Sequence, residues 1–111
     1  MVDEIDEPPP VPAQPLSNAD VDRALASLRG WRREEGGIRK RVRRGNFRDA
    51  ITYVNAIANL AEEAGHHPDI DIRWRTLTFR CSTHSAGGIT ELDVALALSI
   101  STEIDRAGEG D

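Results

Sequence analysis

The spacing of apolar residues along the chain alternates between a helical period and a strand period. The longest helical stretch covers residues 47–64, where apolar side chains recur every three or four positions and form one stripe on a helix. That stripe consists of Phe47, Ala50, Ile51, Val54, Ile57, Ala58 and Ala61. Asn46 stands where an N-cap belongs, and Gly65 stands where a C-terminal cap belongs. The pattern therefore predicts an amphipathic helix between these two residues.

Two further helices are predicted, one on each side of this segment. The first begins at Ser17, which has the spacing of a capping box with Asp20, and Gly30 supplies a stop signal. Its apolar positions are Val21, Leu25 and Leu28. The last helix begins at a similar box formed by Thr90 and Asp93. Its apolar positions are Leu92, Ala95, Leu96, Ile100 and Ile104.

Two pairs of strands are predicted between the helices. The first pair follows Trp31 and turns at the Glu-Glu-Gly-Gly run of residues 34–37, where glycine permits a tight hairpin, before a strand over residues 38–44. The second pair occupies residues 70–83, in which apolar and polar side chains alternate. Its apolar positions are Ile70, Ile72 and Trp74 before a turn near Arg75 and Thr76, and Leu77, Phe79 and Cys81 after it.

The predicted order is helix, strand pair, helix, strand pair, helix. Tight turns pair neighbouring strands antiparallel, and each helix has one apolar face to bury against the sheet. We therefore expect an α+β fold in which a four-stranded antiparallel sheet has three helices packed on one face. The other face would stay uncovered, which favours a homodimer or a homotetramer.

Length and composition predict one domain with two short disordered ends. The 111 residues suffice for one hydrophobic core and are too few for two. Residues 1–16 are acidic, contain five of the six prolines and have no periodic apolar face, so we expect a disordered tail. The predicted domain covers residues 17–106, and residues 107–111 are the other disordered end.

Charge and hydropathy exclude several classes of partner. The net charge is −5, which argues against nucleic acid because neutralising phosphates requires a basic surface. No apolar run approaches the roughly 18 residues needed to cross a bilayer, and the acidic N-terminus does not resemble a signal peptide. The single cysteine, Cys81, excludes an intrachain disulfide and is interpreted as a small buried apolar residue. We therefore expect a cytoplasmic protein without a membrane partner.

One predicted strand is unusually basic for an acidic protein. Its charged residues are Arg39, Lys40, Arg41, Arg43 and Arg44. These charges can simply keep a solvated edge strand from pairing with another chain. They can also form a docking surface for an acidic protein partner.

All three histidines lie within nineteen residues, at predicted ends of elements. His66 and His67 follow the second helix directly, and His84 lies just past a strand. Glu62 lies one helical turn before His66 and can orient an imidazole by a hydrogen bond. Three interpretations follow: surface and capping histidines, a zinc site of three imidazoles with Glu62, or an acid–base pair that works near neutral pH.

The run of residues 62–68, Glu-Glu-Ala-Gly-His-His-Pro, belongs to a longer pattern of fixed gaps. The pattern continues with Trp74, His84 and Asp93. It resembles the signature of the pterin-4a-carbinolamine dehydratase family, and the resemblance covers about residues 17–105. The chain departs from the family pattern at Val42 and Arg44, where aromatic residues are common, and at Leu92, where arginine is common.

The resemblance implies a reaction and roles for the site residues. Members of this family dehydrate 4a-hydroxytetrahydropterin to quinonoid dihydropterin in tetrahydrobiopterin recycling, with no metal or organic cofactor. The implied catalytic set is His66 and His84 as the acid–base pair, His67 as a pterin-binding residue and Glu62 as the group that orients a histidine. The implied pocket lining is Pro68, Thr83 and Ser85.

The resemblance leaves three residues with two interpretations each, and it leaves a second function open. Asp93 fits helix capping, which we favour, as well as a site role. Trp31 and Trp74 fit core packing, which we favour for both, and contact with the flat pterin ring. The family also includes dehydratase-like proteins that act as assembly factors for Rubisco, and the alternative function is such a non-enzymatic scaffold.

Overall fold

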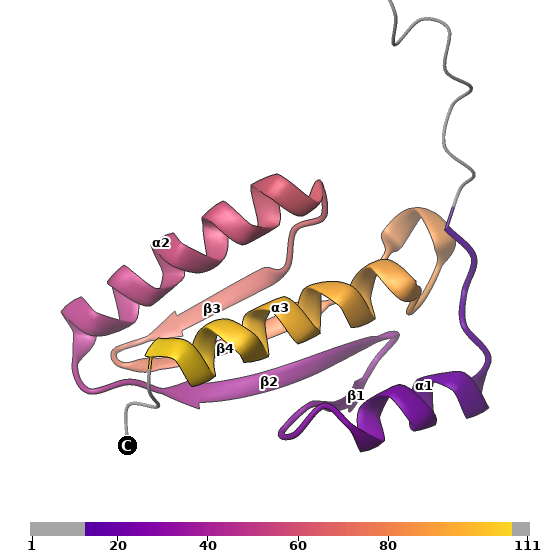
Figure 1. Ribbon diagram of the computed structural model, residues 1–111, viewed down its shortest axis with the longest axis horizontal. Coiled ribbons are helices and arrows are strands. Elements are labelled where there is room, and N and C mark those ends of the chain that lie inside the picture. Colours follow the sequence, from indigo (N-terminus) through magenta and orange to yellow (C-terminus); the bar gives the residue numbers. More distant parts are fainter. Residues whose placement is uncertain (1–12, 108–111) are drawn as a thin grey trace, which may run out of the picture.

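The computed structural model describes residues 13–107 (Figure 1), so most of the two ends predicted to be disordered lies outside the described residues. The elements are α1 (Asn18–Ala26), β1 (Arg32–Glu34), β2 (Gly37–Arg43), α2 (Phe47–Ala64), β3 (Asp69–Arg73), β4 (Thr76–Cys81), the short 3₁₀ helix η2 (His84–Ala86) and α3 (Glu91–Ala107). The predicted α+β order of helices and strands is confirmed. No helix within residues 13–107 is long and apolar enough to cross a membrane.

The four strands form one antiparallel sheet in the order β1-β2-β4-β3. Each hairpin pairs its own two strands, and β2 pairs β4 from Ile38 opposite Cys81 to Arg43 opposite Thr76. The basic strand β2 is therefore central, and its interpretation as an edge strand is wrong. The physical reason is that α2 connects the two hairpins and lets β4, which is apolar on one side, lie beside β2.

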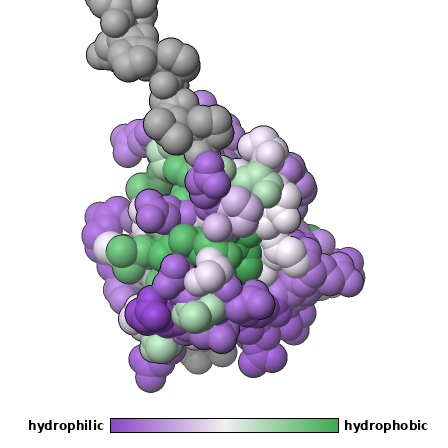
Figure 2. All heavy atoms as spheres, turned by 90° about the vertical axis from the view of Figure 1, so that its right-hand side faces the viewer, coloured by the Kyte–Doolittle hydropathy of each residue, from purple (hydrophilic) through white to green (hydrophobic). Residues whose placement is uncertain are grey.

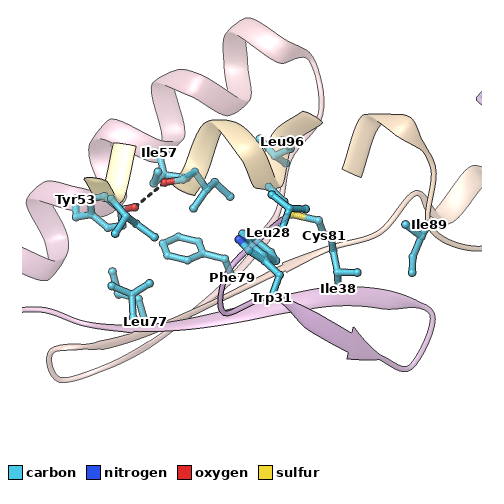
Figure 3. Close-up of a cluster of buried hydrophobic side chains, with 14 of the residues drawn as sticks. Leu28, Trp31, Ile38, Tyr53, Ile57, Leu77, Phe79, Cys81, Ile89 and Leu96 are labelled. Carbon is cyan, nitrogen blue, oxygen red and sulfur yellow. Dashed lines mark hydrogen bonds between the residues drawn. The ribbon is translucent and has the colours of Figure 1, made fainter. Parts of the chain in front are cut away.

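The helices pack on one side of the sheet, with α2 and α3 side by side over the strands (Figure 1). The core between the two layers contains Ile38, Ile57, Leu77, Phe79, Leu96 and Ile100, all essentially without exposed area (Figure 3). Tyr53 of α2 meets the Phe79 ring edge-on at 5.9 Å and donates a hydrogen bond to the Ile100 carbonyl at 3.1 Å. This contact fixes α2 against both the sheet and α3.

The helix caps agree with the sequence predictions, with one shift. The Asn46 side chain accepts a hydrogen bond from the Asp49 amide at 2.8 Å, and Gly65 ends α2 with φ +66°. The Ser17 side chain accepts from the Asp20 amide at 3.1 Å. However, α1 ends at Ala26, before Gly30, because the next residue, Ser27, already bonds back to the Ala24 carbonyl.

The prediction that Trp74 packs in the core is wrong. Arg73 pairs with Thr76, so Trp74 and Arg75 form a two-residue turn between β3 and β4. Trp74 has φ +59° and is 84% exposed. Alternation alone assigned Trp74 to the apolar face, but this hairpin turns one residue earlier than expected. The same prediction for Trp31 is confirmed: it is buried, and its Nε1 donates to Ser101 Oγ at 2.8 Å.

The buried face of α3 also differs from its prediction. Leu92 and Ala95 are exposed, and the buried positions are Asp93, Leu96, Ala97, Ile100 and Ile104. The reason is that the fold buries a carboxylate, Asp93, in the first turn, which rotates the neighbouring apolar residue Leu92 outward.

Apolar side chains also gather on the surface shown in Figure 2, and a groove of about 630 Å³ runs between α1 and α3.

Candidate active site

The candidate site begins where α2 ends. Gly65 takes a left-handed conformation, which a glycine adopts without steric cost, and turns the chain out of the helix. The amide of His66 then bonds to the Ala61 carbonyl at 3.3 Å. The His66 ring lies against the start of α3, where its Nε2 is 2.6 Å from Oδ1 of Asp93. Only 13% of the His66 side chain is exposed, so the ring is held in place.

Asp93 is fully buried and connects three elements of the fold. Its Oδ2 accepts hydrogen bonds from Thr83 Oγ1 at 2.8 Å and from the Thr90 amide at 2.9 Å, and its Oδ1 faces His66. The Thr83 and Thr90 hydroxyls are themselves 2.8 Å apart. Asp93 therefore caps α3 and holds His66 at the same time, so both interpretations of this residue apply. A buried carboxylate with this many donors is well satisfied.

The contacts of Asp93 determine which nitrogen of His66 carries its proton. Thr83 and Thr90 both direct hydrogens at the carboxyl group, which suits an ionised acceptor. A carboxylate can only accept, so His66 Nε2 must be the protonated ring nitrogen. Within residues 13–107, Nδ1 of His66 has no hydrogen-bond partner. Nδ1 of the neutral ring is then a proton acceptor that is available to a substrate.

The other two histidines are more exposed. His67 Nε2 is 2.8 Å from Glu62 Oε2, and both side chains are mostly solvent-exposed. Glu62 therefore orients His67, whereas Asp93 orients His66. His84 is exposed and begins η2, one residue after Thr83.

The loop that carries His84 is anchored at both ends. Thr83 and Gly88 exchange backbone hydrogen bonds at 2.9 and 3.3 Å, and Gly87 has φ +76°. Thr83 also bonds to Asp93, so the exposed residues His84 and Ser85 directly follow a residue that contacts the His66–Asp93 pair in space. Pro68 follows the other two histidines at the start of β3. The structure thus gathers most of the predicted site around the ends of α2 and β4 and the beginning of α3.

Two predicted site residues lie away from this cluster. Trp31 is buried in the core and bonds to α3 through Ser101. Trp74 lies beyond the five-residue strand β3, so it is separated from Pro68 by about 16–20 Å at the usual rise per residue. Thr90 is an additional member that the sequence indicated only as a cap residue. Its position three residues before Asp93 is the signal that pairs the two.

The remaining groups near the site are inert or dispersed. Burial, followed by the negative charge of Asp93, raises the pKa of the Cys81 thiol to about 12, so it stays protonated at neutral pH. Among residues 13–107, no three His, Cys, Asp or Glu side chains are grouped in a way that could hold a metal ion.

Comparison with known proteins identifies the family. A profile described as pterin 4 alpha carbinolamine dehydratase matches residues 14–103, which include every member of the cluster. The chain belongs to this family. The predicted resemblance is therefore confirmed.

Relatives of this dehydratase-family chain occur in mycobacteria. A protein of Mycolicibacterium smegmatis is 55% identical over 85 residues, which are 77% of this chain and 90% of the relative. A protein of Mycobacteroides abscessus is 53% identical over 91 residues, which are 82% of this chain and 97% of the relative. Both are named "Putative pterin-4-alpha-carbinolamine dehydratase".

Two solved structures share the fold. A transcriptional coactivator/pterin dehydratase from Brucella melitensis is 26% identical, with a TM-score of 0.78 over 81% of this chain and 98% of that one. A pterin dehydratase-like protein identified as a RuBisCO assembly factor in the alpha-carboxysome is 20% identical, with a TM-score of 0.54 over 66% of this chain and 84% of that one. At that identity, the second likeness concerns the fold alone.

Proposed function

We propose that the protein is a 4a-hydroxytetrahydrobiopterin dehydratase, a hydro-lyase that converts the carbinolamine to quinonoid dihydropterin and water in tetrahydrobiopterin recycling. The observation that carries the proposal is the buried His66–Asp93 pair, with His84 on the adjoining loop. A two-proton elimination requires one base and one acid, for which a held imidazole with a free nitrogen and a second imidazole on the adjoining loop are suitable.

The proposed reaction is a balanced transfer of two protons. Nδ1 of His66 takes the proton from N5 of the pterin, and the N5 electron pair forms the N5=C4a double bond. The C4a–O bond breaks with its electrons on oxygen, and His84 in its protonated form gives that oxygen a proton, so water leaves. The buried carboxylate of Asp93 stabilises the positive charge that develops on His66. No metal or organic cofactor takes part in these steps.

The other site residues bind or position the substrate in this proposal. His67, oriented by Glu62, donates to a polar edge of the pterin, and Pro68 and Ser85 line the pocket. Thr83 has a different role from the predicted one, because its hydroxyl is buried and already bonded to Asp93 and Thr90. Thr83 holds Asp93, and through Asp93 also His66, in position, and it does not need to touch the substrate.

The decisive experiment measures dehydration of freshly generated 4a-hydroxytetrahydrobiopterin. We expect the wild-type protein to accelerate the step well above its spontaneous rate, and His66→Ala to lower the catalysed rate by about 10²–10⁴-fold. Glu63→Gln is the matched control, since Glu63 is an exposed neighbour on α2. If the folded wild-type protein gives no acceleration, the proposed enzyme function is wrong.

The second candidate function is a non-enzymatic assembly factor, for example for Rubisco. It is favoured by the arginine-rich sheet surface around Arg41 and Arg43, which the proposed reaction does not use. The same wild-type assay separates the two functions. In either case we propose a cytoplasmic homodimer or homotetramer, because Leu92 and Leu98 of α3 expose apolar side chains that a second copy of the chain can cover.

A further inference from the structure

The face of the sheet opposite the helices is hollowed and polar. The core takes the side chains of Ile38, Val42, Leu77 and Phe79 from the other face. On the open face the structure has a depression of about 730 Å³. It is lined by Arg41, Asp71, Arg73, Trp74, Thr76, Thr78 and Arg80. None of these residues belongs to the histidine cluster.

This open face is positively charged on a negatively charged protein. Six arginines alternate onto it, namely Arg32, Arg39, Arg41, Arg43, Arg73 and Arg80, against the three carboxylates of Glu34, Asp69 and Asp71. The face thus has an excess of positive charge, although the chain has a net charge of −5. The excess negative charge therefore lies elsewhere on the molecule. This separation of charge is expected of a protein whose positive surface attracts an acidic ligand.

Two of the three open-face arginines on β2 have no internal partner, and among residues 13–107 Arg32 of β1 has none either. Glu34 forms ion pairs with both Arg39 and Arg80, and it thereby separates two arginines that lie directly opposite each other. Arg41 and Arg43 are exposed and, within residues 13–107, form no ion pair. Both lie on the central strand β2, so their guanidinium groups are available for bidentate bonds to carboxylates.

Trp74 adds an apolar contact at the rim of the depression. It is the most exposed of the large hydrophobic residues that the structure describes, at 84%. Its backbone has φ +59°, a left-handed conformation that is strained for a bulky residue. Tryptophan and arginine are the residue types that most often dominate binding energy at protein interfaces. An exposed tryptophan in a strained turn beside unpaired arginines therefore has the composition of a binding surface.

We propose that this surface, the arginine face (Arg41, Arg43, Arg73, Arg80 and Trp74), binds an acidic segment of a partner protein. The carboxylates of the segment pair with Arg41 and Arg43, and one of its apolar side chains packs on Trp74. The threonine hydroxyls between the arginines provide hydrogen bonds to polar groups of the segment. The proposal is independent of the dehydratase function and concerns a different part of the fold.

The same surface does not suit nucleic acid. A nucleic-acid strand carries one phosphate about every 3.4 Å, and the carboxylates of Asp69, Asp71 and Glu34 would lie beneath such a strand. A protein segment can instead space its carboxylates to match Arg41 and Arg43, the two unpaired arginines of β2. The net charge of −5 also opposes a long polyanion more than a short acidic segment.

The test uses fluorescence anisotropy with the full-length protein. The probe is a labelled peptide of alternating glutamate and serine with one central leucine, and the comparison probes are the same peptide with lysine for glutamate and a single-stranded oligonucleotide of equal charge. We expect binding of the glutamate peptide alone, weakened by added salt. A tighter complex with the oligonucleotide, or no binding of the glutamate peptide, would overturn the proposal.

Matched charge reversals locate the binding surface. We expect the double variant Arg41→Glu/Arg43→Glu to weaken peptide binding by at least about tenfold. The control Arg29→Glu/Arg48→Glu changes the net charge equally, but on exposed residues of the helical side, and should weaken peptide binding much less. Trp74→Asn should also weaken binding without loss of fold, since asparagine tolerates positive φ. Equal weakening by both double variants would mean a general charge effect and would refute the proposal. If instead the wild-type protein dimerises through this face, the occupant is a second copy and the proposal is also refuted.

Discussion

Replacement of Asp93 by asparagine tests the proposed link between the start of α3 and the chemistry of His66. Asparagine has the same shape as aspartate, but one oxygen becomes an NH₂ group that can only donate. Oδ2 receives two donors, from Thr83 and Thr90, so the amide oxygen fits best at that position. The NH₂ group then faces His66 Nε2, which must give up its hydrogen. The His66 proton moves to Nδ1, the atom proposed to act as the base.

The magnitude follows from the three contacts of Asp93. In each contact, a hydrogen bond to a charged carboxylate is replaced by a hydrogen bond between neutral groups. The difference in stability is about 1 kcal/mol for each contact. Removal of a buried charge offsets part of this loss because its desolvation cost disappears. We therefore expect Asp93→Asn to lower the free energy of unfolding by about 1–3 kcal/mol while the protein stays folded. The dehydration rate should fall by about 10²–10⁴-fold, because the base is in the wrong tautomer.

The assay combines activity and stability with one direct observation of His66. Nitrogen-15 chemical shifts distinguish a protonated from an unprotonated ring nitrogen, and urea unfolding gives the stability difference. Asp105→Asn is the matched control, because Asp105 is an exposed residue of the same helix. The reasoning is refuted if the variant keeps the hydrogen on Nε2, or if it loses the hydrogen there and remains fully active.

Three further outcomes follow from single residues. Gly65→Ala should destabilise the protein by about 1 kcal/mol in urea unfolding, because φ is +66° at this position. The cause is the backbone conformation alone, since a Cβ would meet no atom within 4 Å, and Gly65→Asn should restore part of the loss. Cys81 should not react with a thiol reagent at pH 8 until the protein unfolds, because burial raises its pKa to about 12. The hydrogen bond from the Gly45 amide, followed by that from Arg44, lowers the pKa of Asp49. The ionised carboxylate therefore contributes to the free energy of unfolding at neutral pH, and this contribution is lost as the pH falls below about 4. In urea unfolding, Asp49→Asn should therefore be less stable than wild type at pH 7, and the gap should narrow at pH 3; a constant gap would contradict the assignment.

The parts of the fold predicted correctly from sequence are those specified by local signals. The second helix was predicted with the observed bounds because Asn46 and Gly65 cap it directly and the apolar stripe between them is long. Trp74 was misplaced because a two-residue turn that starts one position earlier moves a residue from a strand into the turn. The central position of β2 was missed because strand order depends on which hairpin edges meet, which no short segment encodes.

The candidate site was predictable as a set of residues but not as a set of contacts. The fixed gaps between the histidines identified the family, and local spacing indicated that Asp93 caps a helix. That the same carboxylate also bonds to His66, 27 residues away in sequence, depends on how α2 and α3 pack. Likewise, Glu62 lies near both His66 and His67 in sequence, and only the turn at Gly65 determines that it contacts His67.

Asp93 has a structural role as well as a proposed catalytic one, whereas His84 has only the proposed catalytic role. A descendant of this protein could therefore lose His84 more easily than Asp93. A change at Asp93 would weaken the start of a helix together with the chemistry, so selection for a stable fold alone would preserve it. His84 lies exposed on a loop that Thr83 and Gly88 close without its side chain. A lineage that kept the fold as a scaffold and abandoned catalysis would therefore be expected to drift first at His84, and to retain the buried carboxylate long after the reaction had gone.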